Sequence, residues 1–189
     1  GAPGADLVAC NLPMCDNVTQ ALSGLPPAAD DPETADVSDH YSCPPKEMDR
    51  LRFEALRPGK TMKDIPEQLW HGTYRRRAFR RVMDGTPKER RGGAPSGLRR
   101  LEPELPSKAI TSGAVSEFIH PAAHRNLTLR ECARLQTFPD DFKFAGTQAQ
   151  RALLIGNAVP PRFADAIAAH LARAFREYST RASKPGLKS

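Results

Sequence analysis

Proline occurs at 18 of the 189 positions of this chain and is spread along most of its length. Each proline fixes its own backbone φ angle and removes a hydrogen-bond donor, so it limits how far a helix or strand can continue. Hydrophobic residues make up 39% of the chain and charged residues 26%, which leaves material for a small core. We expect short elements joined by long connections, either as one modest domain or as a lobe attached to part of a larger one.

The amino-terminal part predicts helices at 18–25 and 44–56, the second opened by Pro44-Pro45 and stopped by Pro58-Gly59. At 73–85, apolar residues recur at helical spacing, but an arginine-rich segment of this kind also fits a strand or an extended loop. A basic loop should follow at 89–97. Residues 107–113 and 116–121 suggest two short strands that pair as a hairpin around Gly113.

The carboxyl-terminal part gives a clearer pattern. Thr128-Leu129-Arg130-Glu131 is a capping box, which predicts a helix from Leu129 to about Thr137, before Phe138-Pro139. Another helix is expected at 148–155, with Gly156 as its stop. Pro160-Pro161 should begin a final helix whose apolar stripe, with large residues at every fourth position, needs a partner surface; the stripe consists of Phe163, Ile167, Leu171 and Phe175.

Positive charge is concentrated between residues 46 and 100, where sixteen basic side chains stand against seven acidic ones, although the whole chain carries only +6. Such a region suits a polyanion, and the arginine fork is a good partner for phosphate or guanine. A merely solvated basic surface is the equal alternative. The leading candidates for DNA contact are Arg75, Arg76, Arg77, Arg80 and Arg81.

No metal site is expected, because the four cysteines form no CxxC pair and no histidine stands at zinc-finger spacing. No apolar run approaches the roughly 18 to 20 residues that span a bilayer. The first residues lack the basic-then-apolar order of a signal peptide. These features favour a soluble, cytoplasmic protein with free thiols.

Two motifs carry a specific resemblance. RNLTLRECARLQTFPDDFKF (125–144) and IGNAVPPRFADAIAAHL (155–171) resemble the ninth and tenth conserved motifs of bacterial DNA cytosine-5 methyltransferases. LPSKAITSG resembles the segment that closes the target-recognition domain of this family, and NVTQALSGLP resembles the entry to that domain. The resemblance is strongest from about Pro106 to Phe175.

The resemblance implies an α+β fold, in which a small irregular DNA-recognition lobe is followed by helices that belong to a Rossmann-like methyltransferase domain. We expect a lead-in and linker at 1–43, a target-recognition region at 44–120, methyltransferase motifs at 121–178 and a flexible tail at 179–189. Double-stranded DNA is the implied partner, and S-adenosylmethionine is the implied cofactor.

By the same resemblance, Asn157, Ala158 and Val159 help line the cofactor pocket, while Thr111 and Ser112 contact the DNA backbone near the flipped cytosine. Residue chemistry alone leaves alternatives: Gly156-Asn157 is also a common helix-ending pair, and Thr111 could simply pack in a buried strand. The motif around Thr128 is a scaffold in the family, so Gln136 and Asp140 should satisfy backbone groups rather than act as acid or base.

The family's catalytic motifs do not occur in this sequence. There is no Pro-Cys-Gln, no ENV triplet and no FxGxG-type loop. The thiolate attack and the cofactor-seating loop of the family therefore have no candidates here. We expect the chain to be inactive alone, either as a fragment or as one polypeptide of a split enzyme whose other chain carries those motifs. A stand-alone, non-catalytic DNA-binding or interaction protein is the alternative.

Overall fold

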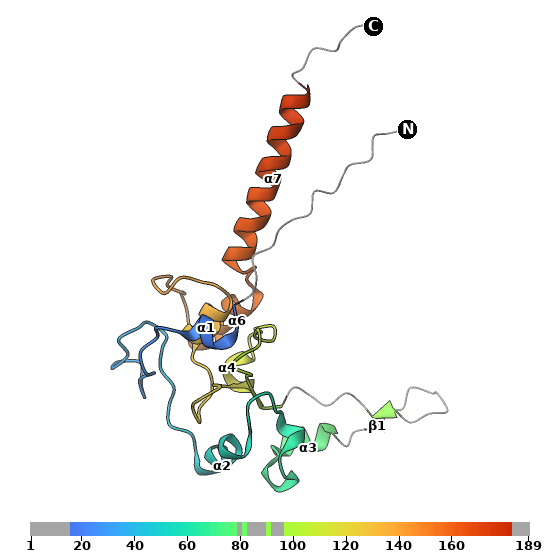
Figure 1. Cartoon of the computed structure of the whole chain (residues 1–189). Coiled ribbons are helices and arrows are strands. Elements are labelled where there is room, and N and C mark those ends of the chain that lie inside the picture. The colour runs from blue at the N-terminus through green and yellow to red at the C-terminus, as the bar shows by residue number, and fades with distance from the viewer. Residues whose placement is uncertain (1–15, 79–80, 83–89, 92–96, 183–189) are drawn as a thin grey trace, which may run out of the picture. The chain divides into compact units, whose positions relative to one another are not determined.

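The computed structural model describes residues 16–78, 81–82, 90–91 and 97–182. By its internal contacts the chain divides into residues 16–158 and a second unit whose described part is 159–182. The elements are labelled in Figure 1.

Short helices and two-residue strands make up the first unit. Its helical elements are α1 (Val18–Leu22), α2 (Glu47–Ala55), the 3-10 turns η1 (Met62–Asp64) and η2 (Glu67–Leu69), α3 (Gly72–Ala78), α4 (Ala114–Glu117), α5 (Leu129–Leu135) and α6 (Gln148–Asn157). Strands β1 (Arg81–Val82) and β2 (Arg90–Arg91) pair antiparallel, whereas β3 (Arg99–Arg100) and β4 (Phe118–Ile119) pair in parallel. The mixture of helices and small sheets confirms the α+β class.

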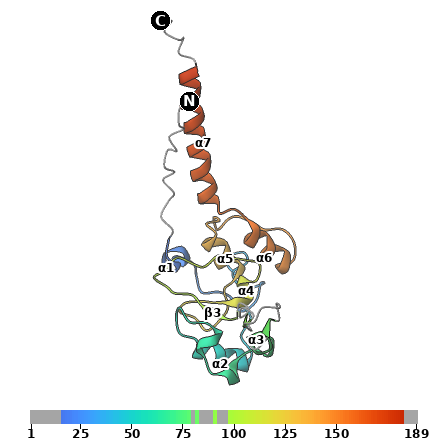
Figure 2. The same ribbon diagram turned by 90° about the vertical axis from the view of Figure 1, so that its right-hand side faces the viewer.

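The buried apolar residues of this unit form two clusters. The α5 cluster gathers around Leu129, Cys132 and Ala133 and includes residues of α1, α4 and α6. The α2 cluster gathers around Phe53 and Leu56 and includes Tyr74 of α3. Figure 2 shows the corresponding arrangement, with α4, α5 and α6 together and α2 and α3 on the other side of β3.

The β3–β4 pair contributes to both clusters because successive side chains of a strand point to opposite faces. In β4, Phe118 belongs to the α5 cluster and its neighbour Ile119 to the α2 cluster. The residues flanking β3 divide in the same way, Leu101 with the α5 cluster and Leu98 with the α2 cluster. Two short strands therefore join the two small cores.

The predicted hairpin around Gly113 is wrong. Residues 107–113 form no strand, and Gly113 has a helical backbone conformation at the start of α4. The second predicted strand exists only as β4, and its main partner is β3, nineteen positions earlier, rather than the residues just before Gly113. The alternation in the sequence signalled burial of Phe118 and Ile119, but a pattern of period two does not identify the partner strand.

Predicted helix bounds were corrected at several points. The segment 73–85 contains both alternatives, since helix α3 ends at Ala78 and strand β1 follows at Arg81. Helix α1 ends at Leu22, before Gly24 with its positive φ of 78°. Helix α2 begins at Glu47 rather than at the proline pair. The basic loop at 89–97 lies mostly outside the described residues, apart from β2 and Gly97.

The second unit contains α7 (Pro161–Ala182), which begins at the proline pair as predicted. Its apolar stripe is exposed, most strongly at Phe175, where 71% of the residue surface is accessible. The need of this stripe for a partner surface stays a prediction. Within the described residues, no helix is both long enough and apolar enough to cross a membrane.

Arg100 fastens α2 to the segment that follows β4, although its charge made it one of the basic residues suited to DNA. Its guanidinium donates to the carbonyl oxygens of Phe53 and Leu56, each at 2.6 Å, and of His120 and Ala123 at 2.6 and 2.8 Å. The side chain is buried, and burial lowers the pKa of its guanidinium. The guanidinium of Arg100 therefore binds carbonyl groups of the protein itself.

Replacing Arg100 with glutamine should lower the free energy of unfolding by at least about 2 kcal/mol, because each buried acceptor left unpaired costs about 1 to 3 kcal/mol. Its neighbour Arg99 supplies the matched control, since it donates no side-chain hydrogen bond to any described residue. Arg99→Gln should stay within about 0.5 kcal/mol of the unaltered chain. Urea unfolding followed by circular dichroism measures both, and equal stabilities would refute the structural role of Arg100.

Candidate DNA and cofactor site

Two segments far apart in the sequence meet at Gly156, near the end of α6. A Cβ atom added to Gly156 would lie 2.4 Å from the backbone nitrogen of Ser112 and 2.6 Å from the carbonyl carbon of Thr111. Both are backbone atoms, which cannot move aside as a flexible side chain can. The residues predicted for DNA contact, Thr111 and Ser112, therefore lie against the helical turn that leads into Asn157 and Ala158.

This close approach corrects the role predicted for Gly156. The sequence placed the end of the helix there, but α6 continues through Asn157 and Ala158 is its C-cap. Gly156 is not among the glycines with positive φ. Glycine is needed here because no side chain fits, and not because of a left-handed backbone conformation.

The side-chain amide of Gln136 connects the same two segments by hydrogen bonds. Gln136 is the buried C-cap of α5, and its Nε2 donates to the carbonyl of Ile155 at 3.1 Å and, at a longer 3.5 Å, to that of Ile110. These carbonyls belong to residues just before Gly156 and Thr111. The expectation that Gln136 satisfies backbone groups is confirmed.

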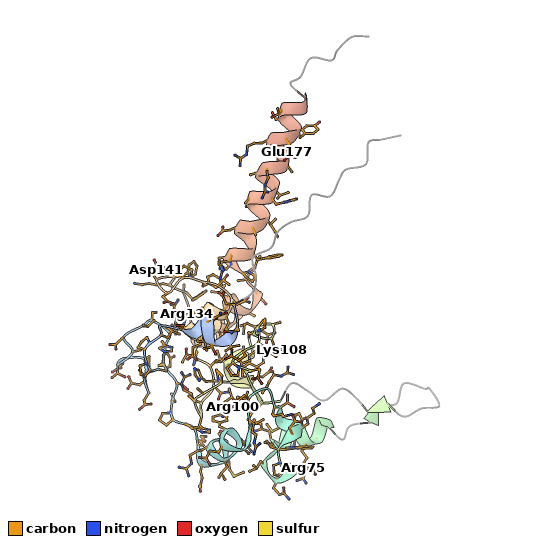
Figure 3. All side chains as sticks on the ribbon, viewed as in Figure 1. Arg75, Arg100, Lys108, Arg134, Asp141 and Glu177 are labelled. Carbon is orange, nitrogen blue, oxygen red and sulfur yellow. The ribbon has the colours of Figure 1, made fainter. Side chains whose placement is uncertain are left out.

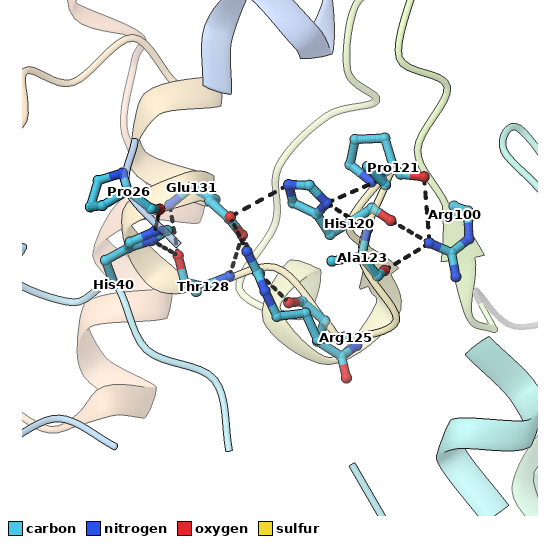
Figure 4. A network of polar contacts seen from close by, with 11 residues as sticks. Pro26, His40, Arg100, His120, Pro121, Ala123, Arg125, Thr128 and Glu131 are labelled. Carbon is cyan, nitrogen blue, oxygen red and sulfur yellow. Dashed lines mark hydrogen bonds and ion pairs between the residues drawn. The ribbon is translucent and has the colours of Figure 1, made fainter. Parts of the chain in front are cut away.

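A network of polar groups holds the beginning of α5 (Figure 4). Thr128 Oγ1 accepts from the backbone of Glu131 at 3.1 Å, and the Glu131 carboxylate accepts from the backbone of Thr128 at 2.8 Å, which confirms the capping box. Arg125 donates two hydrogen bonds to the same carboxylate. Burial alone would raise the pKa of Glu131, but the hydrogen bonds and charge of Arg125 outweigh it and lower that pKa.

Two histidines extend this network. His40 is buried, and its Nε2 donates to the carbonyl of Pro26, so its Nδ1 accepts from the Thr128 hydroxyl at 3.0 Å. His120 lies near Glu131, and its Nδ1 accepts from the backbone of Ala122 and Ala123. Burial lowers the pKa of His120. The ring of His120 is therefore bound as a neutral structural group.

Other polar residues of this motif are also structural. The guanidinium of Arg130 is bound by the carbonyls of Ser38, Pro139 and Phe142. Arg134 forms an ion pair with Asp140, which lowers the pKa of that carboxyl. Asp140 was expected to bind backbone groups and instead pairs with this side chain. Carbonyl groups therefore bind Arg130, and a carboxylate binds Arg134.

The candidate ligand-facing side chains differ from these scaffold residues in their exposure. Thr111 and Ser112 are exposed and lie in no strand, so buried strand packing is wrong for Thr111. Thr111 Oγ1 accepts from the backbone of Gly113 at 3.3 Å, which leaves its hydroxyl hydrogen available. Asn157 is also exposed, and its amide has no partner among the described residues. Val159 belongs to the second unit, where it is 60% exposed.

The arginine cluster is only partly described. Arg75 and Arg76 are exposed on α3, where Figure 3 labels Arg75, and Arg75 lies 3.7 Å from a carboxylate oxygen of Glu67. Arg77 is described by its backbone in α3 and Arg81 by its backbone in β1. Arg80 lies outside the described residues. DNA contact by these residues stays a prediction.

A pocket of about 700 Å³ opens beside Ser112, α4 and α6. Its lining is mainly apolar and includes Val115, Leu129, Ala152 and Leu153. Within the described part of the chain, no group of three or more histidine, cysteine or acidic residues could hold a metal ion. Cys132 is buried, and burial raises its pKa strongly, so it is not a thiolate nucleophile.

Sequence patterns did not identify His40 or Arg100. Their partners are distant, since His40 binds a residue 88 positions away and Arg100 binds one 47 positions away. No spacing rule connects residues at such separations. Thr128 and Glu131 were found because a capping box joins residues only three positions apart.

Gly156→Ala should destabilise the first unit by about 1 to 3 kcal/mol, because the new methyl group would overlap the backbone at Thr111 and Ser112. Gly72→Ala is a suitable control, since a Cβ atom there meets nothing within 4 Å. Thermal unfolding of the two variants provides the comparison. A Gly156→Ala protein that melts with the unaltered chain would contradict the close approach.

Sequence comparisons relate this chain to a known protein family. The sequence profile of the family described as C-5 cytosine-specific DNA methylase matches residues 32–173. The chain is 39% identical over 114 residues to the type II methyltransferase M.AquIB of Picosynechococcus sp., covering 54% of this chain and 82% of that protein. It is 34% identical over 127 residues to M.AgeI of Thalassovita gelatinovora, covering 61% of this chain and 30% of that protein.

A plant relative gives the same result over a longer segment. DNA (cytosine-5)-methyltransferase 1A of Oryza sativa subsp. japonica is 28% identical over 169 residues, which cover 75% of this chain and 10% of the relative. The chain thus spans most of M.AquIB but less than a third of M.AgeI and of the plant protein. The profile match covers well over half of the sequence, and this chain belongs to the C-5 cytosine-specific DNA methylase family.

Proposed function

We propose that this chain supplies the DNA-recognition region and part of the cofactor pocket of a DNA cytosine C5-methyltransferase. In the complete enzyme, a methyl group would pass from S-adenosylmethionine to a cytosine in duplex DNA. The observation that carries the proposal is the close backbone approach between Thr111–Ser112 and Gly156. It holds residues of the two implied binding sites beside each other within one unit.

On the DNA side, the proposal assigns Thr111 and Ser112 to the sugar-phosphate backbone. Both side chains are exposed, and a hydroxyl is a short donor that suits a phosphate oxygen. Gln136 would keep this segment in place through the carbonyl of Ile110. Contacts to phosphate fix the register of a protein on DNA, so these residues would orient the duplex rather than read its sequence.

On the cofactor side, Asn157, Ala158 and Val159 would line part of the pocket for S-adenosylmethionine, which supplies the methyl group when bound. The exposed amide of Asn157 offers both a donor and an acceptor, and the small side chain of Ala158 leaves room for a ligand to approach. Asn157 therefore fits the polar part of such a ligand. Helices α6 and α7 would belong to a Rossmann-like domain that other parts of the enzyme complete.

The catalytic groups would come from elsewhere. Cys132 is buried, and exposed Cys43 stands in Ser-Cys-Pro rather than in the family's Pro-Cys-Gln. A second polypeptide with the missing motifs would supply the attacking thiolate and would cover the apolar stripe of α7. The extent of M.AquIB supports this division, because the aligned segment makes up 82% of that type II methyltransferase.

Purified alone, this chain should transfer no labelled methyl group from S-adenosylmethionine to duplex DNA, because no thiol stands in the required motif. Transfer should appear when a separately purified chain that bears the missing motifs is added. In that mixture, Asn157→Ala should raise KM for the cofactor by several-fold with little change in KM for DNA.

The control for this assay is the added chain without the present chain, which should also be inactive. Methylation by the present chain alone, in protein shown free of host methyltransferase, would contradict the proposal. Duplex binding with no recovery of activity by any chain that bears the missing motifs would instead favour a stand-alone DNA-binding protein.

DNA affinity should depend on the arginine cluster. Replacing Arg75, Arg76, Arg77, Arg80 and Arg81 with alanine should weaken binding to a labelled duplex and reduce the slope of log K against log salt by roughly 0.9 for each phosphate that the protein no longer neutralises. Fluorescence anisotropy between 50 and about 200 mM salt measures this slope. An unchanged slope would show that the cluster is only a solvated surface.

A further inference from the structure

A hollow of about 390 Å³ lies in the first unit, between the turn after α2, strand β3 and the segment that leads toward Thr111. Charged residues contribute much of its lining. Four of them are basic, namely Lys60, Arg99, Arg100 and Lys108, and one is acidic, Glu102. Positive charge therefore predominates in this hollow.

The backbone holds these residues together. Gly59 donates to the carbonyl of Arg100 at 3.1 Å, and the backbone nitrogen of Arg100 donates to the carbonyl of Lys60 at 3.0 Å. Gly59 has a φ of 74°, a conformation that favours glycine, and this turn brings Lys60 beside β3. Lys60 and Arg99 thus come from adjacent segments that hydrogen bonds keep in register.

Arg99 and Arg100 are neighbours with opposite environments. The guanidinium of Arg100 is fully engaged by interior carbonyls. The side chains of Lys60, Arg99 and Lys108 form no hydrogen bond or ion pair with any other described residue. Three unpaired cations around one hollow repel one another, and a bound anion would remove that cost. Figure 3 labels Arg100 and Lys108 in this part of the unit.

Glu102 is the acidic residue of the lining, and its carboxylate does not pair with the side chains of Lys60, Arg99 or Lys108. A Cβ atom added to Gly59 would lie 2.5 Å from its carboxylate oxygen, so the carboxylate rests over the Gly59 turn. It forms no ion pair with the described side chains of Lys60, Arg99 or Lys108. The hollow therefore keeps an excess of positive charge.

We propose that this hollow binds a phosphate group of the DNA backbone through Lys60, Arg99 and Lys108. Lys108 is three residues before Thr111, so the segment that would touch the backbone through its hydroxyls continues directly into the hollow. Charge complementarity and this continuity identify DNA as the occupant. The inference rests on the DNA recognition proposed above and adds to it a phosphate site outside the arginine cluster of α3 and β1.

The test is duplex binding by the full chain across a range of salt concentrations. Replacing Lys60, Arg99 and Lys108 with glutamine should reduce the slope of log K against log salt by roughly 0.9 for each cation that neutralised a phosphate, or about 2 to 3 for the triple variant. The matched control replaces Lys46, Arg57 and Lys63, which are exposed, carry the same charges and lie outside the hollow. The control should change the slope by less than about one unit.

A pair of acidic residues gives a test of opposite sign. Glu102→Gln removes the negative charge from the hollow and should tighten duplex binding by several-fold. Glu104→Gln makes the same change two residues away, outside the lining, and should have a smaller effect. Circular dichroism should show every variant folded, because none of the replaced side chains is buried.

The outcomes separate the two proposals. If the unaltered chain binds duplex DNA and the hollow variant keeps its salt slope, the phosphate site is overturned while DNA recognition stands. If the control variant loses as much slope as the hollow variant, only total charge matters and the site is again overturned. If the unaltered chain binds no duplex, DNA recognition by this chain fails and the phosphate site fails with it.

Discussion

The hydrogen bonds of the buried Glu131 carboxylate are the interactions on which the packing around α5 depends. It caps α5 through the backbone of Thr128 and binds both terminal nitrogens of Arg125. The hydroxyl of Thr128 in turn hydrogen-bonds to Nδ1 of His40, so the segment around His40 is tied to the start of α5. At the other end of α5, Gln136 binds the two segments that form the candidate site. A short, well-capped helix therefore positions both segments of the candidate site.

Arginine serves two different purposes in this protein, and a count of charges does not separate them. Arg100 and Arg130 bind interior carbonyls, whereas Arg75 is exposed and Arg99 is partly exposed. A guanidinium has five donors, so a single side chain can satisfy several carbonyls that short, irregular elements leave without partners. This use suits a fold in which two-residue strands provide few backbone hydrogen bonds. Only the accessible arginines can contribute to an interface with DNA.

The sequence predicted local structure well where the cause was local. The capping box of α5, the helix at 148 and the start of α7 at the proline pair were all confirmed. The hairpin around Gly113 was wrong because Phe118 and Ile119 pair in parallel with β3. The motifs identified the family, and the structure then showed that Thr111 is exposed and that Gly156 is constrained by space. The arginine cluster was inferred from charge alone and stays a prediction.

By itself, the sequence determined the α+β class, the helices of the conserved motifs and the family to which the chain belongs. Capping, proline and helical periodicity act over three or four residues, so they can be recognised in a single segment. Only the tertiary structure decided that Gly156 touches Ser112, that Arg100 is interior while Arg99 is not, and that Lys60 lies beside β3. Those facts depend on close packing and hydrogen bonds between segments tens of residues apart, which no local pattern records.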